Sequence, residues 1–129
     1  MEITFDGNKV ITAHLNGHII KTDQPVEGGG TNTAPTPFEL FLASLGTCAG
    51  IYIKGFCDNR GLSTDGIKLI QNMQFDPESG LPTDITIDIQ VPQSFPERYV
   101  PALIHVAELC KVKRTMDNPP AFEVKSTII

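Results

Sequence analysis

The stretch that decides the fold is TPFELFLASLGTCAGIYIKGFCDNRG, residues 36 to 61. Thr36 is a favoured N-cap residue, Pro37 suits a first helical turn, and Glu39 stands three positions after the cap, as in a capping box. Gly61 stands where helices commonly end on a residue with left-handed backbone. These signals predict one long helix that begins at Pro37 and ends near Gly61.

This helix is apolar around most of its circumference, and Glu39 is the one charged residue between Phe38 and Ile53. A helix of this kind needs cover on more than one side, so we expect a central element of the fold. The apolar stretch is shorter than the roughly 18 to 20 residues that span a bilayer, which favours a buried helix. Gly46 and Gly50 would let another backbone approach closely, although ordinary core packing explains them as well.

The residues before this helix are expected to form short strands and then a loop. Ile3 and Phe5 alternate with polar neighbours, and Asn16-Gly17 is a typical hairpin turn, so residues 2 to 22 predict a three-stranded meander. Residues 24 to 36 hold three consecutive glycines and two prolines without apolar periodicity, which predicts a loop. A glycine run can also cradle a phosphate, but no Gly-Lys-Ser/Thr follows this one.

The residues after the helix predict a hairpin and a second helix. Residues 67 to 75 and 85 to 91 read as two strands, because ITIDIQV alternates strictly between apolar and polar positions. Apolar residues at helical spacing predict a helix from Phe95 to about Lys111, and residues 122 to 129 predict a closing strand. The expected fold class is α+β, with antiparallel sheets, a long central helix and a second helix.

Size and composition predict a single globular domain over residues 1 to 129, of which 40% are hydrophobic. The formal net charge is −5 and the basic residues gather only at 111 to 114, so general binding to nucleic acid or to a membrane is not expected. The N-terminus lacks the basic start and apolar block of a signal peptide, and three cysteines do not suit a secreted disulfide framework. We therefore expect a cytoplasmic protein.

Metal and serine chemistry find little support in the sequence. His14 and His18 are separated by a predicted turn, His105 has no nearby partner, and no C-x-x-C or H-E-x-x-H motif occurs. Ser44 lies inside a predicted helix with no G-x-S-x-G around it. We expect no metal site, which leaves the cysteines as candidates for chemistry.

The three cysteines have different surroundings. Cys48 lies in the middle of the long helix between small residues, and Cys57 lies nine residues further on, which places it on the opposite side of the helix. Cys110 is expected to close the second helix beside the basic run 111 to 114, whose cations favour a thiolate while the helix dipole opposes it. Taken singly, each cysteine is either a small inert hydrophobe or a nucleophile.

A resemblance to a known protein family favours the interpretation that two of the cysteines are nucleophiles. Residues 37 to 48, PFELFLASLGTC, closely resemble the P-x-E-L-L-L-A-S-L-G-x-C signature of the OsmC/Ohr family, named for osmotically inducible protein C and organic hydroperoxide resistance proteins. Residues 110 to 116, CKVKRTM, look like the second motif of that family. The order of the predicted elements also follows the family over nearly the whole chain. The resemblance implies an OsmC-like fold built as an intertwined homodimer.

The resemblance also implies a thiol-dependent peroxidase. Cys48 would be the peroxidatic cysteine that attacks an organic hydroperoxide and becomes a sulfenic acid. Cys110 would resolve it as a disulfide, which a small thiol or a dithiol carrier would reduce, with no bound cofactor. Glu39 has two interpretations, a carboxylate of the family's active site or the capping-box residue, and we favour the cap.

One departure from the family favours a competing interpretation. Family peroxidases carry an arginine in the N-terminal strands, whereas this chain has none before Arg60, and Lys9 and Lys21 are the cations there. Lysine supplies charge without the planar fork of arginine, so Arg114 or a residue of a partner subunit would have to replace it. The alternative is a small-molecule-binding or redox-sensing OsmC-like protein without efficient peroxidase activity.

Overall fold

The computed structural model describes all 129 residues. The chain divides into two compact units, Met1–Ser44 and Leu45–Ile129. Each unit is described by itself, and the expectation of one domain stays a prediction. Both sheets are antiparallel and three α-helices are present, which confirms the α+β class.

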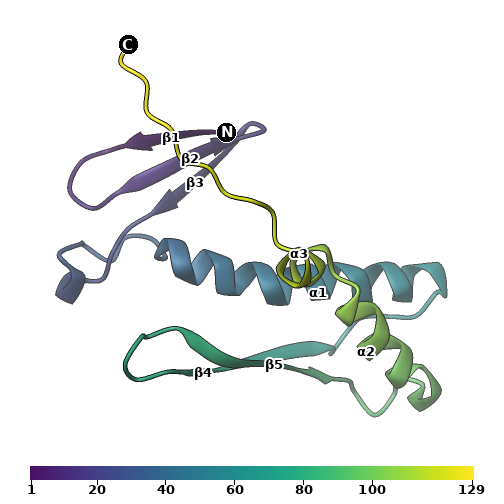
Figure 1. Cartoon of the computed structure of the whole chain (residues 1–129). Coiled ribbons are helices and arrows are strands. Elements are labelled where there is room, and N and C mark those ends of the chain that lie inside the picture. The colour runs from purple at the N-terminus through teal and green to yellow at the C-terminus, as the bar shows by residue number, and fades with distance from the viewer. The chain divides into compact units, whose positions relative to one another are not determined.

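The first unit begins with the predicted three-stranded meander. Strands β1 (Glu2–Phe5), β2 (Ile11–Leu15) and β3 (His18–Thr22) form an antiparallel sheet in the order β1-β2-β3 (Figure 1). The turn between β2 and β3 has φ of 50° at Asn16 and 80° at Gly17. Asparagine and glycine adopt such positive φ angles most readily, so the turn and the strand register follow from these two residues.

The loop after β3 is organised by one buried carboxylate, that of Asp23. Thr31 and Thr33 donate to Asp23 Oδ2 through their hydroxyls at 2.7 and 2.8 Å, and Gln24 N donates to Oδ1 at 2.7 Å. The amides of Thr31 and Thr33 add bonds of 3.3 and 3.0 Å. A Cβ at Gly30 would collide with the Gln24 carbonyl, which explains this glycine. The donors that a phosphate would need here are therefore used by the protein's own carboxylate.

Helix α1 spans Pro37–Asn59 and begins one residue after Thr36, as predicted. Its C-terminus is closed by Gly61, which has φ of 64°, and by Leu62 N, which donates to Cys57 O at 2.9 Å. This six-to-one hydrogen bond after a left-handed glycine is a Schellman motif. The end of the longest helix is thus fixed by local chemistry.

The length of α1 corrects one expectation. Residues 37 to 58 are long and apolar enough to meet the length and composition of a membrane span, a test that core helices of soluble proteins also pass. The expectation that the stretch is too short was wrong, because the turns after Ile53 extend it. In the apolar part of this stretch, 28% of the residues are buried inside the protein. Much of this apolar helix is therefore uncovered by its own chain.

The second unit contains the predicted hairpin, β4 (Lys68–Phe75) and β5 (Pro82–Gln90) (Figure 1). Strand β5 starts three residues before its predicted start. Alternate residues are half-buried and pair as Leu69–Ile89, Gln71–Ile87 and Met73–Ile85. Gln71 lies against α1, because a Cβ at Gly46 would stand 2.9 Å from Gln71 Oε1, whereas nothing lies within 4 Å of one at Gly50. A side chain, and not a backbone, makes the close approach at Gly46.

The second helix predicted from Phe95 to about Lys111 forms two short elements, and an unpredicted helix follows it. A 3-10 turn, η2 (Glu97–Tyr99), leads into α2 (Val100–Glu108), and a further helix α3 (Lys111–Asp117) follows. The prediction that Cys110 closes the second helix is wrong, because Cys110 is the N-cap of α3. The apolar periodicity breaks at this point, and the sequence pattern after it was too short to reveal a new helix.

The core of the second unit lies between α1, α2 and the hairpin. Its buried members are Ile53, Phe56, Cys57, Phe95 and Leu103. Aliphatic side chains of β4, β5 and α2 pack around them, including Leu69, Ile89 and Val106. The side of α1 that carries Ile53, Phe56 and Cys57 is therefore buried in the core. Residues on the adjacent side of the helix can contribute to a functional site.

The last residues of the chain correct another expectation. Residues 118 to 129 contain no helix or strand, so the predicted closing strand from 122 to 129 is not formed by this chain alone (Figure 1). Phe122 is 90% exposed and Val124 is 96% exposed. A strand needs a hydrogen-bonding partner, and this segment has strand-like residues without one.

We predict that Asp23→Asn lowers the urea midpoint at about pH 7. Hydrogen bonds from Thr33, Thr31 and Gln24 hold the pKa of the Asp23 carboxyl far below its usual range. A carboxylate with a lowered folded-state pKa stabilises the fold above its unfolded pKa, near 3.8, and this stabilisation is lost as the pH falls.

The gap between the wild type and Asp23→Asn should therefore shrink between about pH 5 and about pH 3. Asp84→Asn, at an exposed position of β5, is the matched control and should leave the midpoint unchanged. Equal midpoints for Asp23→Asn and the wild type at neutral pH would contradict the role of this carboxylate.

Candidate functional site

Cys110 occupies the junction between α2 and α3. Its side chain is 3% exposed, and its Sγ accepts a hydrogen bond from Lys113 N at 3.4 Å, which makes the thiol the N-cap of α3. The positive end of a helix dipole faces an N-cap residue. The sequence predicted that the helix dipole would disfavour a thiolate at Cys110. That prediction is reversed, because Cys110 begins a helix instead of ending one.

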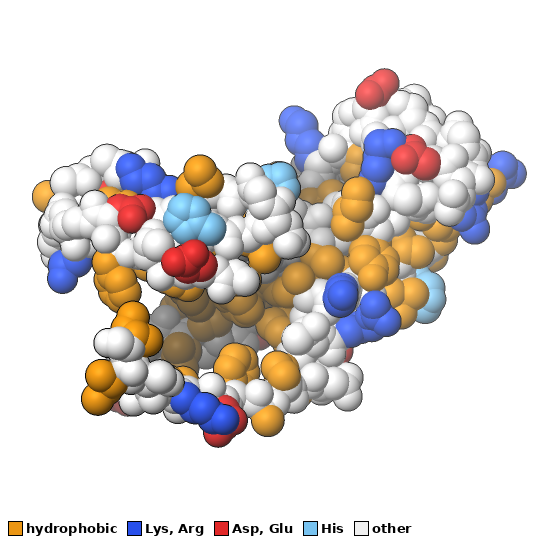
Figure 2. All heavy atoms as spheres, turned by 90° about the horizontal axis from the view of Figure 1, so that it is seen from above, with side chains coloured by type: hydrophobic (Ala, Val, Ile, Leu, Met, Phe, Trp, Pro, Cys, Tyr) orange, Lys and Arg blue, Asp and Glu red, His pale blue; other side chains and the backbone are white.

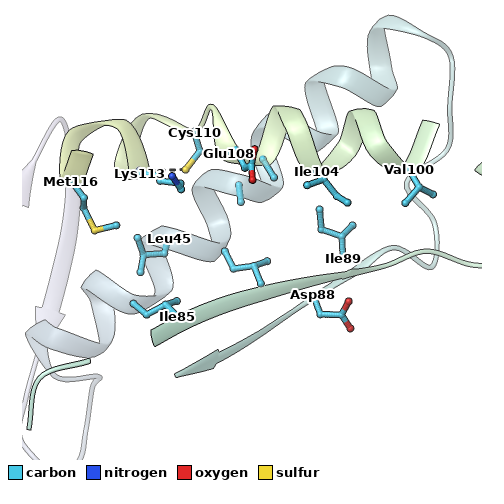
Figure 3. Close-up of a pocket in the computed structure, with 13 residues that line it drawn as sticks. Leu45, Ile85, Asp88, Ile89, Val100, Ile104, Glu108, Cys110, Lys113 and Met116 are labelled. Atoms are coloured by element: carbon cyan, nitrogen blue, oxygen red, sulfur yellow. Dashed lines mark hydrogen bonds between the residues drawn. The ribbon is translucent and has the colours of Figure 1, made fainter. Parts of the chain in front are cut away.

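A cavity of about 560 Å³ lies beside Cys110 (Figure 3). Its walls come from α1, β5, α2 and α3, and most of the side chains are aliphatic. They include Leu45, Ala49, Ile85, Ile87, Ile89, Val100, Ile104, Ala107 and Met116. This volume and lining are typical of a pocket for a small apolar molecule.

The charged residues of the cavity lie at its edges. Lys113 Nζ pairs with Asp117 Oδ2 at 3.3 Å, one turn along α3. Asp88 alternates with the inward isoleucines of β5 and points away from the cavity in Figure 3. Its carboxylate accepts a hydrogen bond from Gln90 Nε2 at 2.9 Å. Glu108 is the third charged residue of the lining, so the cavity is mostly apolar and its polar groups are the thiol and these charged side chains.

Cys48 lies on α1 and is half-buried, so part of this residue is exposed to solvent, unlike the buried Cys57 and Cys110. The cavity is lined by Leu45 and Ala49 but not by Cys48. Since Ala49 follows Cys48 by one residue, the two side chains differ by about 100° around the helix. Cys48 thus lies on the side of α1 adjacent to the side that carries Leu45 and Ala49 and forms the cavity wall. We call this adjacent side of α1 its flank.

One polar contact joins this flank of α1 to α3. Arg114 Nη2 donates a hydrogen bond to Tyr52 Oη at 3.3 Å. Tyr52 follows Cys48 by four residues, and Arg114 follows Cys110 by four residues. Residues four apart on a helix share a face, so the contact lies one turn beyond each cysteine. Sequence reasoning named Arg114 as a possible cation but missed Tyr52, although its spacing from Cys48 was visible.

Cys57 is remote from this chemistry. It is fully buried in the core of the second unit, and burial, with a smaller contribution from the Asp58 carboxylate, raises the pKa of its thiol. A thiol that is sealed and protonated is a poor nucleophile. Its place among core residues agrees with the expectation that Cys57 lies on the opposite side of the helix from Cys48.

Glu39 lies in the first unit and forms the predicted capping box. Thr36 N donates to Glu39 Oε2 at 2.7 Å, and Glu39 N donates to Thr36 Oγ1 at 3.2 Å. The capping interpretation is therefore confirmed. A further catalytic role of its charge stays a prediction.

No group of three His, Cys, Asp or Glu side chains is arranged to hold a metal ion. All three cysteines are free thiols. Cys48 and Cys110 are the candidate nucleophiles, and the hydrogen bond between Tyr52 and Arg114 lies one turn beyond each of them.

Comparison with known proteins gives a family and a fold. A family model described as OsmC-like protein matches residues 29 to 125. A crystal structure from Psychrobacter arcticus, named for an inferred osmotic stress and detoxification response, aligns with a TM-score of 0.75 and 21% identity over 88% of this chain and 85% of that one. An organic hydroperoxide resistance protein from Legionella pneumophila, also described as a predicted redox protein, aligns with a TM-score of 0.54 and 18% identity over 89% and 85%. The sequence matches no curated protein.

We predict that Glu39→Gln keeps the stability of the wild type, because glutamine also completes a capping box. Glu39→Ala should lower the free energy of unfolding, because it removes the acceptor of the Thr36 amide while the Thr36 cap itself is kept. Urea titration of both variants measures the difference. A loss of stability in Glu39→Gln equal to that in Glu39→Ala would contradict the cap as the main structural role.

Proposed function

This chain belongs to the OsmC-like protein family, and we propose that it reduces organic hydroperoxides with Cys48 and Cys110. The observation that carries the proposal is that the chain has one partly exposed thiol, that of Cys48, and one buried thiol, that of Cys110, which lines an aliphatic cavity. Cys48 is half-buried on α1, and Cys110 forms part of the wall of the cavity. The cavity would hold the organic part of the hydroperoxide.

In the first step, the Cys48 thiolate attacks the distal oxygen of ROOH. The O–O bond breaks, a sulfur–oxygen bond forms, and the leaving alkoxide takes a proton, which gives a sulfenic acid and the alcohol ROH. The sulfur is oxidised and the peroxide is reduced by two electrons. The thiolate is the reactive form, so access to solvent matters for this residue.

In the second step, the Cys110 thiol attacks the sulfenic sulfur of Cys48 and releases water, which leaves a disulfide. Two thiols of a small reductant, or one dithiol carrier, then restore both cysteines and become a disulfide themselves. No bound cofactor takes part. Three free cysteines also suit a reducing compartment, and we propose the cytoplasm.

We further propose that the protein acts as an intertwined homodimer. Helix α1 is apolar on sides that its own chain leaves open, as Ile51 shows with 63% exposure. The segment from 122 to 129 has alternating strand-like residues without a partner strand. Figure 2 shows many apolar side chains at the surface of the single chain. A second copy would cover the helix and pair the segment with a sheet edge.

A second candidate function is the binding of a small apolar molecule without catalysis. The cavity includes the Cys110 thiol but not Cys48, and no arginine precedes Arg60. A pocket can retain an apolar ligand after the peroxide chemistry has become inefficient. This candidate predicts thiols that survive long exposure to peroxide.

Counting thiols during exposure to cumene hydroperoxide separates the two candidates. The reduced wild type, with three cysteines per chain, should lose two thiols per chain. Cys48→Ser should lose none, Cys110→Ser should lose one, and Cys57→Ser should behave like the wild type because Cys57 is sealed in the core. An unchanged thiol count in the wild type would overturn the peroxidase proposal and favour the binder.

We predict that sedimentation velocity shows a dimer, and that removal of residues 119 to 129 weakens it. The truncated chain should show a larger fraction of monomer at micromolar concentration, because the unpaired segment can no longer join a partner. Val124→Ala is a milder variant on the same segment. A wild type that sediments as a monomer at all concentrations would contradict the proposed assembly.

A further inference from the structure

The flank of α1 that carries Cys48 also carries Tyr52. Four residues correspond to about 40° around an α-helix, so the two side chains leave α1 on nearly the same line. Side chains on a helix lean toward its N-terminus. From this general lean, we expect the phenol of Tyr52 to extend back toward the turn that contains Cys48.

Arg114 fixes this phenol in place. Its guanidinium donates to Tyr52 Oη at 3.3 Å, and this contact bridges α3 and α1. A tyrosine hydroxyl has one hydrogen to donate in addition to its acceptor positions. Because Tyr52 accepts from Arg114, its own hydrogen can point toward a reactant beside Cys48.

The peroxide step needs a group of this kind. When a thiolate attacks the distal oxygen of an alkyl hydroperoxide, the leaving group is an alkoxide, which is a strong base that must receive a proton. A positioned acid commonly accelerates such a step by about 10² to 10⁴. The phenol of Tyr52, held by Arg114, is a group of this kind.

We propose that Tyr52 is a catalytic residue that gives its proton to the leaving oxygen, and that Arg114 is its positioning residue. The inference rests on the proposed reduction of hydroperoxides. Cys48–S⁻, ROOH and the phenol give Cys48–SOH, ROH and a phenolate. The guanidinium of Arg114 stabilises this phenolate, which then recovers a proton from water.

Several other cations of the second unit are engaged elsewhere. Arg60 lies over the ring of Phe56, 3.9 Å from its centroid, and Arg98 lies over Tyr99 at 4.9 Å. Lys113 pairs with Asp117. Arg114, by contrast, is hydrogen-bonded to Tyr52, which follows Cys48 by one helical turn on α1.

The test compares three reactions of Cys48 in a Cys110→Ser background. Cumene hydroperoxide releases an alkoxide and needs an acid, whereas peracetic acid releases a stabilised carboxylate and iodoacetamide releases iodide. We expect Tyr52→Phe to slow the reaction with cumene hydroperoxide by about 10- to 100-fold. The reactions with peracetic acid and iodoacetamide should change less than about 3-fold, because their leaving groups need no proton.

Tyr99→Phe is the matched control, since Tyr99 is the other tyrosine of the chain and its hydroxyl also accepts from an arginine, Arg98 Nη2, at 3.4 Å. This control should leave all three rates unchanged. Arg114→Gln keeps the phenol and should slow cumene hydroperoxide selectively, while Arg114→Lys should recover part of the loss.

Two results would overturn the inference. Equal rates with cumene hydroperoxide in Tyr52→Phe and in its parent would show that the phenol gives no proton. A parallel fall in all three rates would show that the residue only supports the structure. Failure of the parent to react with cumene hydroperoxide, while iodoacetamide still modifies Cys48, would instead overturn the proposed function itself.

Discussion

The structure depends on a helix that is too apolar to stand alone and is fixed at both ends. The capping box of Thr36 and Glu39 sets where α1 begins, and the Schellman motif at Gly61 sets where it ends. Between them, the buried face packs on the β4–β5 hairpin and α2, while the remaining faces stay open. The burial of one face determines the direction in which Cys48, Tyr52 and Cys57 point.

This division of α1 explains why three cysteines in one chain differ in chemistry. Cys57 faces the core, where burial keeps it protonated and inaccessible. Cys48 lies on the flank between the buried and the open faces. Cys110 is buried as well, yet it borders a cavity and caps a helix. The proposed chemistry uses the partly exposed thiol first and the sheltered thiol second.

Much of the fold could be predicted because its signals are local. The capping box, the left-handed Gly61, the Asn16-Gly17 turn and the alternation in β5 each act within a few residues of sequence. The helix start and the strand pairs were therefore found close to their observed bounds. The family was also predicted correctly, since residues 37 to 48 form a compact motif.

The errors occurred where local pattern and tertiary context diverge. The helix from 111 to 117 is short and capped by a thiol, which is a weak cap signal, so Cys110 was assigned to the wrong helix end. The segment from 122 to 129 has strand-like residues, but a strand also requires a partner edge. The contact between Tyr52 and Arg114 joins residues 62 positions apart, and no periodicity in the sequence reports such a pair.

The central claim is that the sulfur of Cys48 reacts directly with a hydroperoxide. The most direct measurement treats the Cys110→Ser variant with a small excess of cumene hydroperoxide in the presence of dimedone and locates the adduct by peptide mass spectrometry. Dimedone traps sulfenic acids, and this variant cannot resolve one through Cys110. The account predicts a dimedone adduct on Cys48 and an unmodified Cys57. Recovery of Cys48 as a free thiol after this treatment would contradict it.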